Sequence, residues 1–485
     1  MSFTSLPALF LLGTAFLYLR WRRKRSPFPL PPGPPRLPLL GNMFNFPSGG
    51  FDWEVYEQWG KKYNSDVLYL KVPGTSIVIL NSVKAARDLF ERRSALYSSR
   101  PKFTFIRQFL GFSWLMPFMP YGAEWKEQRR LFQRHVHPNQ ELGSGQVAEL
   151  ATEYSRTLVL HLLDTPEDYL KHIYRTVCST LQSAAYGSCS VENNASYLAV
   201  AGEVMQVLSD SSIPIATLVD SAPWAVRFLP RSVLPPAFSK GNHYWKGLHH
   251  QFRDEPFDYA QNSQNDSFVS RCLAGLQPSE DLVSQKDHIK DAAAIFFIGG
   301  SSTTVALMHT FILAMLAFPE CQSKAQAELD RVVGQNRLPE LSDKDSLPYL
   351  SALYKEVHRW KTVGPIGIPH YLESDDVYDG YLIPGKSIVI GNAWAMLQDE
   401  MEYPDPKAFK PERFLKQGKI DASIRDPASI VFGFGRRICP GAHIAQAISW
   451  MQIATILSSF NISPATDKFG NAETPTMEYH NGITL

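Results

Sequence analysis

The sequence predicts a mainly α-helical protein with small β-sheets, an α+β fold in one large domain behind an N-terminal transmembrane helix. The chain has 485 residues, of which 44% are hydrophobic and 20% charged, as is typical of a folded globular protein. An uncharged run and a proline-rich segment precede the globular part. Beyond residue 80, most segments have helical patterns and only a few have the alternation of strands.

The N-terminus has the pattern of a membrane anchor. Residues 2–19 carry no charge, and eighteen residues at ~1.5 Å each span about 27 Å, one hydrocarbon core. Residues 20–25 then hold five cations in six positions. In a signal peptide the charges usually precede the apolar run. We therefore expect residues 1–25 to be an anchor whose basic flank, with the body of the protein, stays on the cytosolic side. A buried terminal helix would not explain the cations.

Residues 26–42 form the expected hinge, because they include seven prolines, which favour a stiff polyproline spacer. No second linker of this kind follows, so residues 43–485 are expected to form a single domain.

The net charge of +1 argues against nucleic-acid binding by bulk electrostatics. Five scattered cysteines are too few for a disulfide framework or a zinc ribbon, and their odd number fits reduced thiols.

The globular part begins with a predicted β-hairpin over residues 66–80 that turns at Pro73 and Gly74. Strand signals return near residues 381–389. Clear helical segments are residues 125–135, 148–163 and 319–333. Residues 100–120 and 216–238 are irregular and apolar, so they are either core-covering loops or the lining of an apolar pocket.

A long apolar helix is predicted over residues 287–318, which contain no proline. Its centre, Gly299 to Thr304, reads GGSSTT, which are poor helix formers. Glycine allows close approach to the backbone, and Ser or Thr hydroxyls can bond the carbonyl four residues earlier. This run of small residues at the centre of the helix indicates either a ligand lying against the helix or tight helix packing.

Two predicted helices each place two polar side chains on one face: an acid with a base on one helix, and a tryptophan with an arginine on the other. Glu356 and Arg359 share a helix face, and Arg413 further on could share the same carboxylate. Trp125 and Arg129 lie one turn apart, where they could grip an anionic group such as a carboxylate. Each pattern alone is also common on solvated helix faces.

Cys439 lies in the sequence FGFGRRICPG, between glycines and after two arginines. The next residues are strongly helical and Pro440 suits a first helical position, so the thiol is expected at a helix N-terminus. There the dipole and free N–H groups lower a thiol pKa. This predicts a nucleophile or a metal ligand; a buried structural cysteine is the alternative.

Together these motifs resemble the cytochrome P-450 superfamily of haem-thiolate monooxygenases in its microsomal, membrane-anchored form. The signature Phe-x-x-Gly-x-Arg-x-Cys-x-Gly is matched by Phe432, Gly435, Arg437, Cys439 and Gly441. Glu356, Arg359 and Arg413 match the family's structural triad. Trp125 and Arg129 match a motif that contacts a haem propionate, and Arg100 and His370 resemble further propionate contacts.

The resemblance implies a P-450 fold with a long central helix over haem, iron protoporphyrin IX, and with the Cys439 thiolate as axial ligand. It also implies an endoplasmic-reticulum protein that faces the cytosol and receives electrons from NADPH through a flavoprotein reductase, with cytochrome b5 as a second donor. The predicted docking face contains Lys126, Arg130 and Arg436. The substrate is expected to be a lipophilic small molecule of secondary metabolism, as in fungal members.

The sequence departs from the family pattern in two places. Ser302 stands where the central helix usually has Asp or Glu, although the following alcohol, Thr303, is present. Proton delivery normally uses that acid and alcohol, so an isomerase or dehydratase that does not use dioxygen is one alternative, and a catalytically weak haem-binding protein is another. The sequence given also stops at Leu485, earlier than the family's usual final strand.

Overall fold

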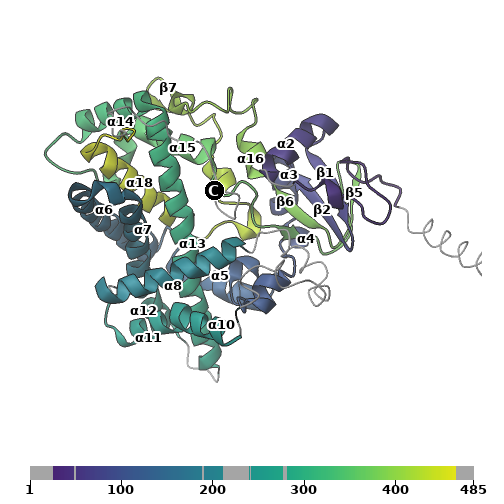
Figure 1. Ribbon diagram of the computed structural model, residues 1–485, viewed down its shortest axis with the longest axis horizontal. Coiled ribbons are helices and arrows are strands. Elements are labelled where there is room, and N and C mark those ends of the chain that lie inside the picture. Colours follow the sequence, from purple (N-terminus) through teal and green to yellow (C-terminus); the bar gives the residue numbers. More distant parts are fainter. Residues whose placement is uncertain are drawn as a thin grey trace, which may run out of the picture.

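The computed structural model describes residues 26–47, 51–187, 191–210, 240, 242–276 and 281–465. The predicted anchor, the irregular segment 216–238 and the end of the chain after residue 465 therefore lie outside the described residues. Figure 1 shows most helices grouped around α13 (Leu282–Ala317), and the main sheet on the other side of the molecule with α2 (Asp52–Tyr63) and α3 (Val83–Ala86). The predicted mainly helical class with small sheets is confirmed.

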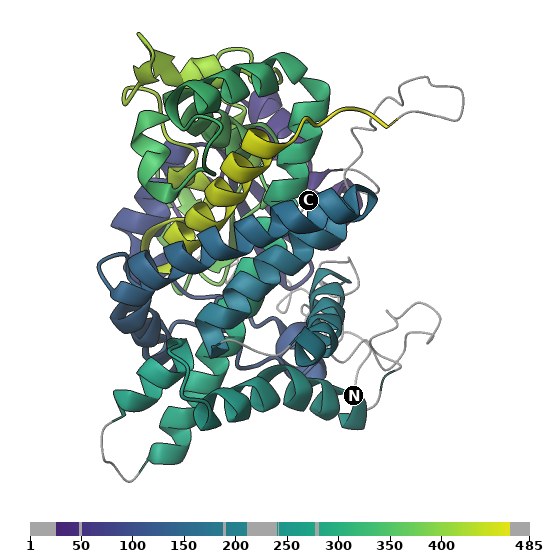
Figure 2. The same cartoon turned by 90° about the vertical axis from the view of Figure 1, so that its left-hand side faces the viewer.

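The remaining helices are α4 (Ser94–Tyr97), α5 (Ala123–His135), α6 (Val147–Asp164), α7 (Tyr169–Tyr186), α8 (Val191–Asp210), α10 (Asn242–His249), α11 (Glu255–Asn262), α12 (Phe268–Ala274), α14 (Pro319–Val332), α15 (Pro348–Trp360), α16 (Ala393–Leu397), α17 (Ala428–Val431) and α18 (Ala442–Ser459). The helices predicted at residues 125–135, 148–163 and 319–333 are α5, α6 and α14, each within two residues of the expected ends. Figure 2 shows α6 lying against α18, and α7 packs on α6 and α13.

The main sheet has the strand order β1-β2-β6-β3. Its members are β1 (Val67–Val72), β2 (Thr75–Leu80), β6 (Ile388–Gly391) and β3 (His370–Tyr371). The predicted hairpin is confirmed as the antiparallel pair β1–β2, and β2 pairs in parallel with β6. The strand signal near residues 381–389 divides between two sheets, because β5 (Tyr381–Ile383) pairs with β4 (Asp376–Tyr378) and only β6 joins the main sheet. A third pair is β7 (Leu415–Lys416) with β8 (Lys419–Ile420).

The predicted long helix is α13, which begins five residues earlier than expected. Its length and composition would also suit a membrane span, but 67% of its apolar stretch is buried inside the described part of the protein. Gly300 packs against α7, since a Cβ there would lie 3.0 Å from the methyl groups of Leu181. Gly299 is exposed and has no atom within 4 Å of a Cβ position. Tight packing, one of the two interpretations that the sequence left open, is therefore confirmed at Gly300, whereas at Gly299 there is open space beside the helix.

The segment before Cys439 is locked against the N-terminal part of the chain. Gly435 has φ +59°, and a Cβ there would lie 2.0 Å from the carbonyl oxygen of Phe90. This close approach, and the left-handed backbone, require glycine at this position.

We expect Gly435→Ala to destabilise the protein by about 2–5 kcal/mol, because it adds left-handed strain to a steric clash with backbone. Thermal unfolding of the purified protein measures the loss. Gly247→Ala is the control, because Gly247 lies inside α10 with no atom within 4 Å of its Cβ position. That change should be neutral or stabilise the protein by up to about 1 kcal/mol. Equal melting temperatures for Gly435→Ala and wild type would contradict the packing argument.

Candidate active site

Cys439 lies at the end of a loop that closes on itself. Phe432 follows α17, and its carbonyl oxygen accepts a hydrogen bond from the Cys439 N–H at 2.8 Å. Gly433 and Gly435 take positive φ angles, which turn the chain twice within this short segment. The loop then passes through Pro440 and Gly441 into α18. The backbone therefore fixes the position of the thiol.

Two expectations about Cys439 need correction. The helix begins at Ala442, so Pro440 is not its first residue and the thiol lies outside the first turn. Burial raises the pKa of the Cys439 thiol; the Gly441 N–H and the Arg129 guanidinium oppose this rise without overcoming it. The residue is nonetheless solvent-exposed, although protein atoms surround it. A side chain that is exposed and yet surrounded by protein lies in a concave part of the surface, and we call the concavity around Cys439 the hollow.

Three arginines predicted to bind propionates lie around this loop, and backbone carbonyl groups accept their hydrogen bonds. Arg437 donates to Ser98 O at 2.7 Å and to Met119 O at 2.8 Å. Its guanidinium lies 4.4 Å from the centre of the Trp125 ring. Arg129 donates to Ile438 O at 2.7 Å, directly before Cys439.

Arg100 is the most deeply buried of the three. It donates to the carbonyl oxygens of Pro117, Ile368 and Pro369 at 2.5–3.0 Å. Among the described residues, no carboxylate lies within ion-pair distance of Arg100, Arg129 or Arg437. Burial lowers the pKa of Arg100, and so does the nearby Arg437. The pKa of Arg437 falls to about 9, chiefly through burial and further through Arg129.

His370 lies beside this group on β3. Its ring stacks on Phe90 with centroids 3.9 Å apart, and Nδ1 is 2.7 Å from Tyr97 O. A carbonyl oxygen only accepts, so Nδ1 carries the proton and Nε2 of the neutral ring is an acceptor. Burial lowers the pKa of His370, and Arg100 adds to that effect. Donation to a carboxylate, the role predicted for His370, therefore requires a second proton on Nε2.

Glu356, Arg359 and Arg413 come together as the sequence predicted. Arg359 Nε and Nη2 each lie 2.8 Å from a different oxygen of Glu356. Arg413 Nε donates to the same carboxylate at 3.1 Å, and so does the Lys410 N–H at 2.8 Å. Glu356 and Arg359 are fully buried. The triad joins α15 to the segment that carries residues 404–413, because Arg359 and Arg413 also donate to Ala408 O.

On α13, Thr303 Oγ1 donates to Gly299 O at 2.9 Å, the bond expected four residues back. Ser302 is partly exposed beside it. No aspartate or glutamate follows Asp291 along the chain until Glu320. This segment of α13 thus presents alcohols where the resemblance implies an acid.

The predicted docking residues are partly assembled. Lys126 and Arg436 both lie against the Tyr121 ring, at 5.2 and 5.3 Å from its centre, and Arg436 Nη1 donates to the Tyr121 hydroxyl at 3.1 Å. Arg130 instead forms an ion pair with Glu127. Sequence reasoning did not identify Tyr121, which is shared by the two cations.

A second polar group that the sequence did not reveal lies further along α13. Asp291 is buried, 2.6 Å from Arg253 Nε, and accepts a hydrogen bond from Gln128 at 3.1 Å. Burial raises the pKa of its carboxyl group to about 7. The only available signal was an acid at the start of a long apolar run.

The irregular segment 100–120 packs mainly in the core, where Phe105, Phe112 and Trp114 are buried.

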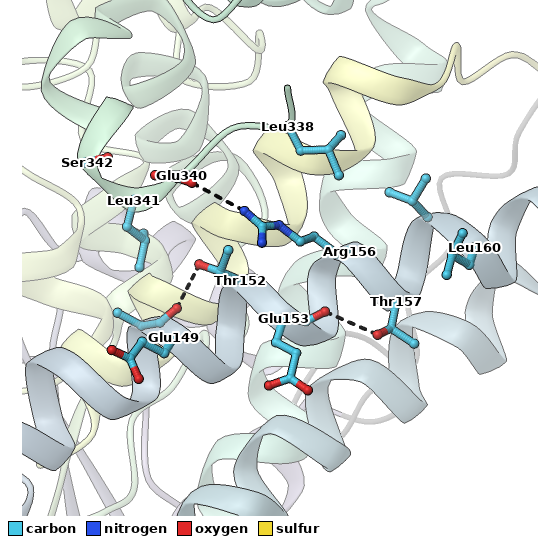
Figure 3. Close-up of a pocket in the computed structure, with 12 residues that line it drawn as sticks. Glu149, Thr152, Glu153, Arg156, Thr157, Leu160, Leu338, Glu340, Leu341 and Ser342 are labelled. Atoms are coloured by element: carbon cyan, nitrogen blue, oxygen red, sulfur yellow. Dashed lines mark hydrogen bonds and ion pairs between the residues drawn. The ribbon is translucent and has the colours of Figure 1, made fainter. Parts of the chain in front are cut away.

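An open groove elsewhere on the surface is not part of this site. It runs between α6 and residues 338–342, and the ion pair Arg156–Glu340 crosses it at 3.3 Å (Figure 3). None of the predicted site residues lines it.

The sequence profile of the family described as "Cytochrome P450" matches residues 31–479. The chain belongs to the cytochrome P450 family. It is similar to "Cytochrome P450 monooxygenase ple1" of Rhodocybe pseudopiperita, 41% identical over 95% of this chain and 88% of the relative. "Cytochrome P450 monooxygenase 98" of Postia placenta is 38% identical over 98% and 92% of the two chains. "Tryptamine 4-monooxygenase" of Psilocybe cyanescens is 37% identical over 96% and 92%.

The protein is therefore a P450 monooxygenase, which sets aside the isomerase and the inactive binding protein as alternatives. The P450 family implies a haem-thiolate cofactor, and the residues of the hollow fit it. A thiol faces the hollow, and beside it the buried Arg100 and the half-buried Arg129 and Arg437 have no carboxylate within ion-pair distance among the described residues. Haem propionates are anions that would neutralise such a group.

Replacing Glu356 with Gln should destabilise the P450 by about 3–5 kcal/mol, because two arginines would lose the carboxylate that balances them in the interior. Urea unfolding followed by circular dichroism measures this loss. The control is Arg156→Gln, which breaks an ion pair whose side chains are 54% and 51% exposed. It should change stability by less than about 1 kcal/mol. Similar losses in both variants would count against a structural role of the triad.

Proposed function

We propose that this P450 inserts one oxygen atom from dioxygen into a lipophilic organic substrate, with Cys439 as the axial thiolate ligand of haem iron. The observation that carries this proposal is the thiol at an internal hollow beside Arg100, Arg129 and Arg437, for which the structure describes no carboxylate within ion-pair distance. A thiolate and two propionates would balance this positive charge, whereas backbone carbonyl groups only orient it.

Within this proposal, haem supplies the activation of dioxygen, and the chain orients the cofactor and the substrate. Arg100, Arg129 and Arg437 hold the propionates, while Trp125 supports Arg437 through its ring face. His370 contributes when Nε2 is protonated. Phe432 and Gly435 shape the thiolate loop, and the buried Glu356 triad keeps the neighbouring segment in place.

Thr303 is proposed to position protons above the hollow. Its hydroxyl proton is committed to Gly299 O at 2.9 Å, which leaves its oxygen lone pairs free to accept a hydrogen bond. Because the Thr303 proton is bonded to Gly299 O, the delivered proton must come from another group. The carboxylic acid that usually supplies it is replaced by Ser302 in this chain. Ser302 and Thr303 are neighbours on one helix, so their side chains point in different directions, and a bridging water molecule would carry the proton between them. We therefore propose a water-mediated relay through Ser302.

The substrate is proposed to be a small aromatic or terpenoid molecule of secondary metabolism. Phe103 and Phe118, from the aromatic segment, contact each other with ring centroids 5.1 Å apart. One relative is named for tryptamine, an aromatic compound. Aromatic side chains favour flat apolar ligands.

Electrons are proposed to come from NADPH through a cytochrome P-450 reductase, with cytochrome b5 as a second donor. The cations Lys126 and Arg436 around Tyr121 would meet an acidic partner surface. The apolar residues 2–19 and the basic residues 20–25 support a single-pass anchor in the endoplasmic reticulum with the domain facing the cytosol. Residues 26–42 would then serve as the hinge.

We expect Cys439→Ser to abolish the thiolate Soret band in the reduced carbon-monoxide difference spectrum, because an alcohol replaces the sulfur ligand. Cys321→Ser is the matched control, because Cys321 is buried on α14 and its thiol should leave the band intact. A thiolate-type band that survives Cys439→Ser would overturn the assignment of the ligand.

Introducing an acid by Ser302→Asp should raise the amount of product formed per NADPH several-fold, since a carboxylic acid delivers protons more readily than an alcohol. The measurement is product and hydrogen peroxide per NADPH with reductase present. Ser302→Ala should lower the same ratio by removing the hydroxyl. If Ser302→Ala couples as well as wild type, Ser302 takes no part in proton delivery.

A further inference from the structure

A buried polar network joins α13, α5, the end of α10 and the irregular segment that contains Trp114. Asp291 on α13 lies 2.6 Å from Nε of Arg253, which belongs to the helical turn His250–Asp254 after α10. Gln128 on α5 is fully buried, and its side-chain nitrogen donates to Asp291 Oδ2 at 3.1 Å and to Trp114 O at 3.2 Å. The Arg253 guanidinium also lies 5.8 Å from the centre of the Trp114 ring. We call Asp291, Arg253, Gln128 and Trp114 the Asp291 network.

His249 holds the irregular segment to α10 as well. Trp114 Nε1 donates to His249 Nδ1 at 3.4 Å, and His249 Nε2 donates to Leu110 O at 2.8 Å. These two bonds require a neutral imidazole ring with its proton on Nε2. Burial lowers the pKa of His249, so the ring stays neutral around pH 7.

The irregular segment connects the Asp291 network to two arginines beside the hollow. Met119 O accepts a hydrogen bond from Arg437 at 2.8 Å, and Pro117 O accepts one from Arg100 at 3.0 Å. One end of the segment is thus fixed by the network, and the other end fixes the two arginines. A loosening of the network would therefore reach the hollow.

The charges around Asp291 balance only when its carboxyl group is protonated. The charged or titratable side chains that face the network are Asp287 and Lys290 of α13, His249 of α10, His250, Arg253 and Asp254 of the turn after α10, and Tyr186 of α7. Two of these are permanent cations, Arg253 and Lys290, and two are acids. An ionised Asp291 therefore adds a third negative charge to a group with two positive charges. His250 is 61% exposed, so solvent screens its charge.

Asp291 is poorly compensated as a carboxylate. It is 7% exposed, and its Oδ1, although close to Arg253 Nε, forms no hydrogen bond among the described residues. Burial raises the pKa of Asp291 to about 7, although Arg253 and Gln128 oppose this rise. The pKa of an aspartate in water is about 3.9. Separation of Arg253 and Trp114 from α13 would let water reach the carboxylate and return its pKa toward that value.

The closed network therefore binds the proton of Asp291 more tightly than an opened network would. Stability of the closed form is greatest at low pH, because the raised pKa belongs to the closed form. Between about pH 4 and 7, each unit of rising pH favours opening by up to about tenfold, and above pH 7 the effect levels off.

We propose that Asp291 is a proton-controlled latch on the irregular segment around Trp114. With its proton in place the network is balanced and closed, whereas loss of the proton leaves excess negative charge that favours separation of this segment and Arg253 from α13. Around neutral pH the latch is poised between the two states, so molecules would exchange with the hollow more readily as the pH rises. The latch does not depend on the reaction proposed above.

The test is hydrogen–deuterium exchange of the full-length haem-loaded protein from about pH 5.5 to 8, followed by mass spectrometry. Each rate is corrected for the intrinsic pH dependence of amide exchange. We expect peptides that cover residues 108–116 and 248–254 to open several-fold more often at neutral pH than at pH 5.5. Peptides from β1 and β2 are the internal control and should show no such dependence. Equal pH dependence in all peptides would refute the latch.

Asp291→Asn imitates the protonated acid with a neutral side chain of the same shape. The two sets of peptides should then exchange slowly at every pH, and the melting temperature near pH 7.5 should equal or exceed that of wild type. The opposite result, a lower melting temperature with faster exchange at every pH, would show that the ionised pair with Arg253 holds these segments together. That result would overturn the proposal.

Asp287→Asn tests the latch without changing a buried group. The Asp287 side chain is 54% exposed, and its charge raises the pKa of Asp291. Its loss should therefore move the midpoint of the pH dependence to lower pH. Asp330→Asn is the matched control, because Asp330 is exposed on α14, and His250→Gln is the control for the exposed histidine. Both should leave the midpoint in place. An unchanged midpoint in Asp287→Asn, or a shifted one in His250→Gln, would show that a group other than Asp291 titrates.

Discussion

The arrangement around Cys439 depends on buried and half-buried positive charge that no carboxylate of the described residues neutralises. Arg100, Arg129 and Arg437 are oriented by carbonyl oxygens from segments far apart in sequence. Each carbonyl contributes a dipole and no net charge, so desolvation of the guanidinium groups remains only partly compensated. A group that brings anions into this hollow therefore stabilises the folded state as well as completing the site. In the proposed haem complex, binding of haem and folding of this region would be coupled through the same three side chains.

The Cys439 loop and the centre of α13 differ in how tightly they are packed. Before Cys439, the close approach of Gly435 to Phe90 and the buried Glu356 carboxylate fix backbone positions. At the centre of α13, Gly299 faces open space, and the Thr303 hydroxyl bonds the Gly299 carbonyl oxygen. The first arrangement keeps the thiol in place, and the second leaves space beside the helix.

Short-range patterns made much of the fold and site predictable. The hairpin at residues 66–80 and the helices α5, α6, α13 and α14 follow from periodicity and turn residues, which act locally. The Glu356 triad followed because a helix places residues three apart on one face. The hydrogen-bond partners of Arg437 and Arg100 could not be predicted, because they are backbone carbonyl groups, which every residue type carries. The pKa of Cys439 was expected to fall and instead rises, because burial depends on surroundings that a single segment does not reveal.

The parallel pairing of β2 with β6 has a consequence for the order of folding. Ile79 lies beside Ile390, so the two strands are separated by about 300 residues of chain. At a synthesis rate of about 5–20 residues per second, β2 waits on the order of 15–60 s for its partner. During this time its apolar edge, with Ile77, Val78 and Ile79, has no neighbour on that side. Unpaired edges of this kind invite pairing with other chains. Shielding of this edge by chaperones until β6 has been made would prevent such pairing.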